Sequence, residues 1–312
     1  MGAMRFSTLA IVAAAVLCAC EPKSPSGGGP AVPATPFGEA FQIRFTWTPT
    51  VGAVEEAEFR TMMVAHSKVR ANGKEQAVDV EQGFEFAFTE ETLKVDGRVA
   101  SEVRRKFSKA AISRSGKRET LGVQGKSLGG KSDQGSFVWT VDSGERLNDQ
   151  DYGSMSEGLG RRGGSGGKDG CVVDEEFGSG KAVKVGDSWH PDAGTLAKLY
   201  ADPGTEVDAA ASRMTCTLKS AEKRGDAVYG AVDLDLDFSV VKSGGGVLNE
   251  PLHFILKGTV TGCLDGSLPD AALKAAITMK GTRTISRPGS NQSMEVDFNL
   301  LIELDSRRAL RK

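Results

Sequence analysis

The sequence predicts a mainly β protein: a curved antiparallel sheet, shaped as a half-barrel or open barrel with two lobes, carrying one or two short helices. Two observations predict this class. Several long segments alternate apolar and polar residues, as half-buried strands do. Long segments with the 3.6-residue period of a helix are missing from the chain after residue 37.

The alternation is clearest in three segments, each with one apolar and one polar face: residues 41–47, 228–240 and 294–304. The same reasoning places further strands at residues 58–70, 77–89, 119–123, 136–141, 213–220, 252–260 and 273–285. Asn72-Gly73 lies between two of them and is a strong hairpin signal. The sequence therefore predicts a succession of hairpins.

Two segments have features of helices. Residues 98–112 are strongly charged with apolar residues at helical spacing, and residues 192–200 begin with Asp192 as a helix cap. Residues 144–180 are rich in Gly, Ser and Asp, which favours a surface excursion or the junction of two halves. We expect residues 37–312 to form one β-rich domain whose two lobes are joined by the loop 144–180.

The N-terminus has the features of an export signal. Arg5 precedes an uncharged run, residues 6–19, which is shorter than the roughly 20 residues that span a bilayer. The run ends in Leu17-Cys18-Ala19-Cys20, which resembles the lipobox of bacterial lipoproteins. The resemblance implies cleavage after residue 19 and acylation of the Cys20 thiol. The alternative is an ordinary secretory signal with Cys20 as a plain thiol.

Residues 20–36 are rich in Ser, Gly and Pro, so we expect them to form a flexible tether between the lipid anchor and the folded domain. Two or three acyl chains on Cys20 would hold the protein durably on a membrane. The sorting pattern known for enteric lipoproteins favours the outer membrane, because Glu21 rather than Asp follows the cysteine. The expected location is the bacterial cell envelope, facing the periplasm or the surface.

Residues 183–189 (VKVGDSW) predict a short strand, a Gly-Asp turn and a tryptophan, Trp189, that folds back onto the sheet. The segment resembles a mid-chain stretch of uncharacterised secreted bacterial lipoproteins, found between two β-rich halves; the resemblance implies no activity. The expected sheet is also similar in architecture to the half-barrels of envelope lipoprotein and lipid carriers, in which a bent sheet wraps an apolar cavity. That likeness alone does not determine function.

Three cysteines remain if Cys18 leaves with the signal and Cys20 is acylated: Cys171, Cys216 and Cys263. Cys216 lies in an expected strand and Cys263 just after another, so we predict a disulfide between them, worth about 4 kcal/mol for the loop it closes. The alternative is that both are small buried apolar residues. The chain has no CxxC, HExxH or histidine cluster, so we expect neither a metal nor a cofactor.

The charge balance, 39 basic against 41 acidic residues, excludes a generally basic nucleic-acid binder. Residues 94–126 are locally basic, with ten Lys or Arg and three acidic residues. The candidates for contact with an anionic surface are Arg104, Arg105, Lys106 and Lys109. The alternatives are a solvated face or pairing with the acidic segment 142–176. The patch requires that these side chains share one face.

Three motifs are discounted. Residues 125–129 (GKSLG) match the nucleophile motif GxSxG, but Ser127 lies among expected strands, and only His190 and His253 follow it. Residues 158–163 (GLGRRG) match GxGxxG without a strand before or a helix after. Asp233, Asp235 and Asp237 are expected to form the polar face of a strand, because side chains about 6.6 Å apart cannot share one cation unaided.

These observations predict a non-enzymatic, lipid-anchored envelope protein that binds an apolar ligand or a lipidated client on its curved sheet. The alternative is a structural or protein-interaction lipoprotein with a filled core, and a hydrolase ranks last. The expected partners are the membrane, through the acyl chains, and a lipid or an envelope protein, with no nucleic acid. The sequence carries no signal for an oligomeric state.

Overall fold

The computed structural model of the chain describes residues 38–45, 47–71, 73–97, 99–133, 136–142, 147–159, 177–192, 206–243, 246–286 and 293–311. The expected signal peptide (1–19), the tether (20–36) with Cys20, and Cys171 lie outside the described residues. Most of the helix expected at 192–200 also lies outside them. Within the described residues, none of the helices combines the length and the apolar character needed to cross a bilayer.

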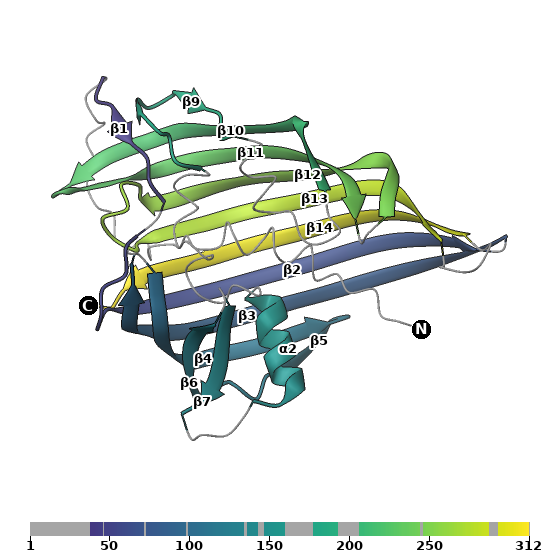
Figure 1. Ribbon diagram of the computed structural model, residues 1–312, viewed down its shortest axis with the longest axis horizontal. Coiled ribbons are helices and arrows are strands. Elements are labelled where there is room, and N and C mark those ends of the chain that lie inside the picture. Colours follow the sequence, from purple (N-terminus) through teal and green to yellow (C-terminus); the bar gives the residue numbers. More distant parts are fainter. Residues whose placement is uncertain are drawn as a thin grey trace.

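A large, curved antiparallel sheet makes up most of the structure and does not close into a barrel, which confirms the predicted fold class (Figure 1). The strand order is β7-β6-β4-β3-β2-β14-β13-β12-β11-β10-β9, with β5 paired to β4. The long strands are β2 (Val54–Ala71), β3 (Lys74–Asp96), β4 (Val99–Arg114), β10 (Glu206–Arg224), β11 (Ala227–Ser243), β12 (Gly246–Cys263), β13 (Ala271–Ser286) and β14 (Ser293–Leu310). The shorter ones are β5 (Lys117–Thr120), β6 (Ser127–Asp133), β7 (Ser136–Val141) and β9 (Ser188–Trp189).

The first and last strands of this sheet in chain order, β2 and β14, are neighbours in its middle. β14 pairs antiparallel with β2 from Met294↔Ala71 to Leu310↔Glu55. This pairing joins the β2–β4 half to the β10–β14 half, so that one continuous sheet results. A separate two-stranded sheet consists of β1 (Phe41–Gln42) and β8 (Ala182–Val183).

Local sequence explains most of these strands and their turns. The predicted hairpin at residues 72–73 is confirmed, with Ala71 opposite Lys74 and Gly73 at φ +71°. Two strand predictions were too long. Only Phe41–Gln42 of the first segment is in a strand, and β5 ends at Thr120, before a turn that extends to Gly125.

The helix predicted at residues 98–112 is wrong, because this segment is strand β4. Its apolar residues Val103, Phe107 and Ala110 have helix-like spacing, but the cause is a β-bulge. β3 residues Ala87 and Phe88 are adjacent, whereas their partners on β4 are Lys109 and Phe107. The extra residue on β4 shifts the alternation by one position and so mimics a helical period.

The helix with defined bounds, α2 (Asp149–Gly158), lies in the segment that we expected to be a loop. Asn148 caps it by accepting a hydrogen bond from the Asp151 backbone N–H. Asp151 is itself buried and accepts a hydrogen bond from the Gly122 N–H at 2.8 Å. These polar contacts attach the helix to the turn that precedes β6.

One face of the sheet, here called the inner face, carries the core side chains. Two hydrophobic clusters occupy it. The first lies on β10–β14 and includes residues of β1, β8 and β9. The second lies on β2–β4, β6 and β7 and includes Met155 of α2, and its centre is a group of phenylalanine rings at centroid distances of 5.2–6.4 Å: Phe59, Phe84, Phe86, Phe88 and Phe107.

Candidate functional site

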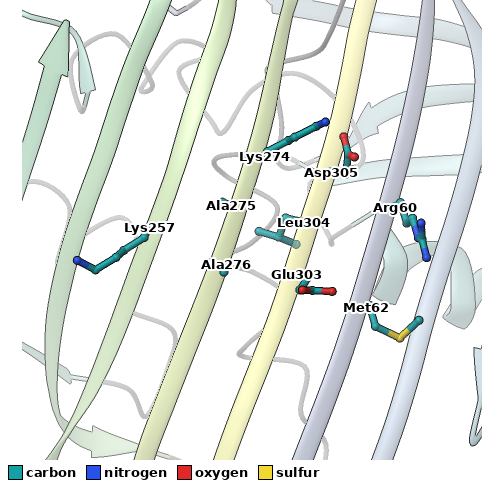
Figure 2. Close-up of a pocket in the computed structure, with 9 residues that line it drawn as sticks. All are labelled: Arg60, Met62, Lys257, Lys274, Ala275, Ala276, Glu303, Leu304 and Asp305. Atoms are coloured by element: carbon teal, nitrogen blue, oxygen red, sulfur yellow. The ribbon is translucent and has the colours of Figure 1, made fainter. Parts of the chain in front are cut away.

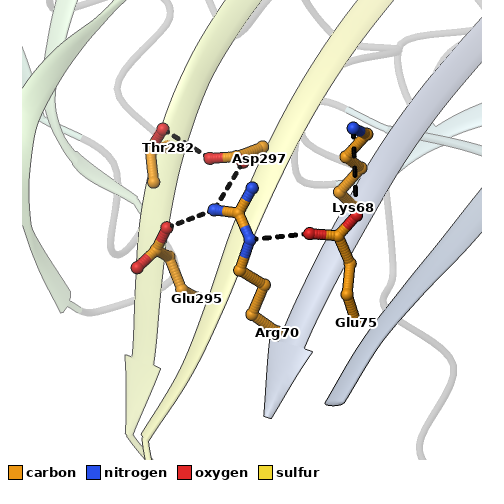
Figure 3. A network of polar contacts seen from close by, with 6 residues as sticks. All are labelled: Lys68, Arg70, Glu75, Thr282, Glu295 and Asp297. Carbon is orange, nitrogen blue, oxygen red and sulfur yellow. Dashed lines mark hydrogen bonds and ion pairs between the residues drawn. The ribbon is translucent and has the colours of Figure 1, made fainter. Parts of the chain in front are cut away.

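The opposite, outer face of the sheet is polar and its strands alternate in charge. β3 and β14 contribute acidic side chains here, whereas β2 and β4 contribute basic ones, and ion pairs link neighbouring strands. Figure 3 shows one such group: Arg70 of β2 bonds Glu75 of β3 at 2.9 Å and Glu295 of β14 at 2.8 Å. These pairs are exposed and individually weak, so the charged side chains of this face remain hydrated.

The three aspartates of β11 belong to this polar face, as predicted. Asp233 accepts a hydrogen bond from Thr259, Asp235 pairs with Lys257, and Asp237 contacts His253. Each carboxylate thus contacts a side chain of the neighbouring strand β12, and the three are not directed at a shared ion. In the described part of the chain, no group of three or more His, Cys, Asp or Glu side chains is arranged to hold a metal.

An open groove of about 420 Å³ also lies on the outer face (Figure 2). It forms where the small side chain of Ala276 lies in register between Lys257 and Glu303. Its lining is mostly charged: Arg60, Met62, Lys257, Lys274, Ala275, Ala276, Glu303, Leu304 and Asp305. A groove with this lining does not suit an apolar ligand.

The inner face presents a continuous apolar wall. The strand register aligns its side chains in rows across the sheet, roughly 6.8 Å apart. One row consists of Leu236, Leu256, Ile277, Ile302 and Met63, and the next of Phe238, Phe254, Met279, Leu300, Ala65 and Val80. The wall therefore extends across six strands, from β11 to β3.

The wall becomes more exposed toward β2 and β3. Leu236 of β11 is fully buried, Met63 and Val80 are only partly buried, and Val78 of β3 is 39% exposed. α2 lies at the β3–β4 end of the molecule, and β1 and β9 lie at the β10 edge (Figure 1). α2 packs through Met155 on the second cluster, whereas Met63 and Val80 pack against the first. By their exposed fractions, the described residues of the wall are most accessible on β2 and β3.

The segment 183–189 covers the other end of the wall. β9 pairs with β10, and the buried Trp189 donates from Nε1 to the Phe177 carbonyl at 2.8 Å. Gly186 N–H donates to the Leu218 carbonyl, and Leu218 N–H donates to the Asp187 carbonyl. The predicted fold-back of Trp189 is confirmed, and it seals the β10 side of the first cluster.

Comparison with protein-family models finds no match to this chain, and comparison with curated proteins finds none either. The site must therefore be interpreted from its own geometry.

Three buried charged side chains and one partly buried arginine lie together on the inner face, where β2, β3, β4 and β14 are neighbours. We call Glu55, Glu90, Arg105 and Arg308 the ionic quartet. Glu90 pairs with Arg105, and Arg308 contacts Glu90 at 2.9 Å and Glu55 at 2.8 Å. The Arg105 guanidinium also lies 4.6 Å from the ring centroids of both Phe88 and Trp139. The formal charges cancel, so the quartet links four adjacent strands and is not a site for a free anion.

Burial raises and the neighbouring arginines lower the pKa of each of the two carboxyl groups, and the net shifts differ in direction. Burial raises the pKa of Glu55, and the Arg308 charge offsets this only in part. Burial also acts to raise the pKa of Glu90, but Arg105 and Arg308 outweigh it and lower that pKa. Glu90 is therefore held as the charged centre of the quartet.

The predicted basic patch does not include Arg105, because that side chain is on the inner face of β4, whereas Arg104, Lys106 and Lys109 are on its outer face. Arg105 is buried on the inner face at 3% exposure. On the outer face, Arg104 pairs with Glu91 and Lys109 pairs with Glu85, while Lys106 is exposed. Side chains of neighbouring strand residues point in opposite directions, so Arg104, Arg105 and Lys106 cannot form one surface. Lys109 also lowers the pKa of Glu85 through its hydrogen bond.

The predicted disulfide is also wrong. Cys216 and Cys263 are both free and buried. β11 separates their strands, and their partners on β11 are Leu234 and Tyr229, which are about 17 Å apart along that strand. A disulfide requires Cα atoms within about 7 Å. The alternative of a small buried apolar residue describes Cys216, whose pKa burial raises to about 12. Cys263 is also buried, but its thiol donates a hydrogen bond to Asp265.

Ser127 is not at a nucleophile elbow. It is the first residue of strand β6 and follows a turn at residues 122–125, whereas the elbow requires a turn from a strand into a helix. Most of the discounted segment 158–163 lies outside the described residues.

The ionic quartet was not predicted from the sequence, although a signal was present. Glu55 and Glu90 occupy inward positions in phase with Phe59 and Phe88.

Proposed function

We propose that this protein holds an apolar ligand, the acyl chains of a lipid or of a lipidated client, on the β2–β3 part of its inner face. The observation that carries the proposal is the partly exposed apolar wall formed by Met63, Val78 and Val80 on a sheet that does not close. Apolar surface that is open to a concave or groove-like space favours apolar ligands.

The charge distribution on the two faces of β2 and β3 also supports an apolar ligand on the inner face. From Met63 to Val69 on β2, and from Gln76 to Gln82 on β3, every inward position is uncharged, whereas half of the outward positions between them are charged. An acyl chain on this wall would displace water without desolvating an ion. Each buried methylene would contribute about 0.8 kcal/mol.

A second candidate is the structural or protein-interaction lipoprotein with a filled core. The burial of the β10–β13 side of the wall favours it, because Leu236, Leu256 and Ile277 are at most 1% exposed. In that case the exposed faces and edges of the sheet, rather than its apolar wall, would contact other envelope proteins.

A pair of adjacent methionines separates the two candidates. Met63 points to the inner face and Met62 to the outer face, so Met63→Glu places a charge in the wall and Met62→Glu is its matched control. The protein would be secreted with Cys20→Ser, incubated with phosphatidylethanolamine–phosphatidylglycerol vesicles, separated from them, and examined by native mass spectrometry. We expect the parent and Met62→Glu to retain lipid, and Met63→Glu to retain at least tenfold less.

Two outcomes contradict the proposal. One is a folded parent that retains no lipid, which would favour the filled-core candidate. The other is equal retention by Met62→Glu and Met63→Glu, since the ligand would then lie elsewhere. Circular dichroism on both variants confirms that each is folded, and Met63→Gln serves as the milder substitution if Met63→Glu does not fold.

We further propose that Cys20 is acylated and anchors the mature chain to the bacterial envelope, at the outer membrane. The lipobox resemblance at residues 17–20 and the Pro/Gly/Ser-rich segment after it support this. We expect the parent to sediment with membranes and Cys20→Ser to be largely released from them. Mass spectrometry should find a diacylglycerol on residue 20, and a parent that is soluble with an unmodified cysteine would contradict the anchor.

A further inference from the structure

Part of strand β3 is an open edge. β3 pairs with β2 from Lys74 to Glu91, but with β4 only from Gln82 to Asp96. The chain leaves β4 at Arg114, opposite Gln82, and turns into β5, so β3 continues beyond both toward the hairpin tip (Figure 1). Among the described strands, none pairs with the free side of residues 74–81, which we call the β3 edge.

The β3 edge presents unpaired backbone groups. The Ser115 N–H donates to the Glu81 carbonyl at 2.9 Å, which shows that odd-numbered residues direct their N–H and C=O groups to this side. Glu75, Ala77 and Asp79 therefore offer three donors and three acceptors, and all three residues are exposed. The β2–β3 register has no bulge, and the edge contains no proline. Such an edge is a template for an added strand.

Charge specifies what the added strand should carry on the outer face. Where β4 is present, its basic residues meet the acids of β3: Arg104 pairs with Glu91, and Lys109 with Glu85. The acidic row continues along the edge through Glu81, Asp79 and Glu75, where β4 has ended. A strand in line with β4 would complete the pattern with basic outward residues.

The inward side of the same edge is apolar. Val78 is 39% exposed and Val80 is partly buried, and both border the wall described above. Inward residues of an added strand would therefore be apolar. A second copy of this chain fits less well, because an antiparallel pair of β3 edges places the acids Glu75 and Asp79 opposite acids of the other copy.

We propose that the β3 edge binds an extended segment of a partner protein by strand addition, and that this segment alternates basic and apolar residues. The segment runs antiparallel to β3, as β4 does, and exchanges backbone hydrogen bonds with Glu75, Ala77 and Asp79. Its basic side chains face the acids of β3 on the outer face, and its apolar side chains cover Val78 and Val80. This proposal does not depend on the binding of an apolar ligand.

The test uses a capped heptapeptide of alternating lysine and valine, with a glutamate–valine peptide as the charge control. Amide hydrogen exchange of the Cys20→Ser protein is measured by NMR with and without peptide. We expect the lysine peptide to slow exchange at Glu75, Ala77 and Asp79, and the glutamate peptide to have no effect. Asp79→Lys combined with Glu81→Lys should reverse this preference.

Ala77→Pro removes the central N–H on the free side of the β3 edge and leaves the hydrogen bonds to β2 in place. Ala77→Thr keeps that N–H and is the matched control. We expect Ala77→Pro to weaken peptide binding at least tenfold and Ala77→Thr to bind as the parent does. Peptide binding that leaves the three amides unprotected would overturn the proposal. So would amides already protected in the free protein, which would show a second copy at the edge if the protein is a dimer, or its own chain if it is a monomer.

Discussion

Replacing Arg105 by methionine is expected to lower the free energy of unfolding by about 3–5 kcal/mol. Arg105 is the direct partner of Glu90, and both side chains are at most 4% exposed. Methionine fills part of the space between Phe88 and Trp139, so the main loss is the compensation of a buried carboxylate. Urea unfolding of parent and variant at neutral pH measures the difference.

The pH dependence of stability should change sign at this site. In the parent, the pKa of Glu90 is lowered, so its contribution is present above the unfolded pKa of about 4.5 and is lost as the pH falls through the folded pKa. In Arg105→Met, burial dominates and raises the pKa of Glu90. The variant should therefore gain stability, relative to the parent, as the pH falls from 7 to 5.

Glu55 acts in the opposite direction in the parent. Its pKa is raised, so its contribution is present below the unfolded pKa and is lost as the pH rises through the folded pKa.

The control for Arg105→Met is Arg104→Met, which removes an exposed pair with Glu91 on the other face and should cost less than about 1 kcal/mol. Equal losses for the two arginines would show that the quartet does not stabilise the fold as described.

Replacing Gly262 by alanine should destabilise the protein by about 2–6 kcal/mol. Gly262 lies near the end of β12 at φ +123°, which side chains rarely adopt. A Cβ there would lie 2.2 Å from the Asp270 carbonyl oxygen and 2.5 Å from the Ala271 Cα. Both atoms belong to the backbone where the paired strand β13 begins, so the β12–β13 hairpin must shift. Thermal unfolding should show a clearly lower Tm.

Gly225→Ala separates the clash from the backbone strain. Gly225 lies in the turn between β10 and β11 at φ +65°, but a Cβ there meets open space. Alanine at this position should cost only about 1 kcal/mol. If both substitutions had the same small effect, the close approach of the two strands at Gly262 would not hold in solution.

Alternation of apolar and polar residues was sufficient to predict most of the strands, because it is a local property of each segment. The sequence placed β7 at residues 136–141 and predicted the hairpin at residues 72–73 and the fold-back of Trp189. It also assigned Asp233, Asp235 and Asp237 to a polar face correctly. Local periodicity was wrong where a bulge interrupts it, as in β4, which has helix-like spacing around Phe107.

Which strands are neighbours could not be predicted from any single segment. The pairing of β14 with β2 brings Arg308 to Glu55 and Glu90 and so forms the ionic quartet. The register across β11 separates Cys216 from Cys263, and the end of β4 leaves the β3 edge open. The physical reason is that backbone hydrogen bonds do not depend on side-chain identity, so a strand's pattern defines its two faces but not its partner.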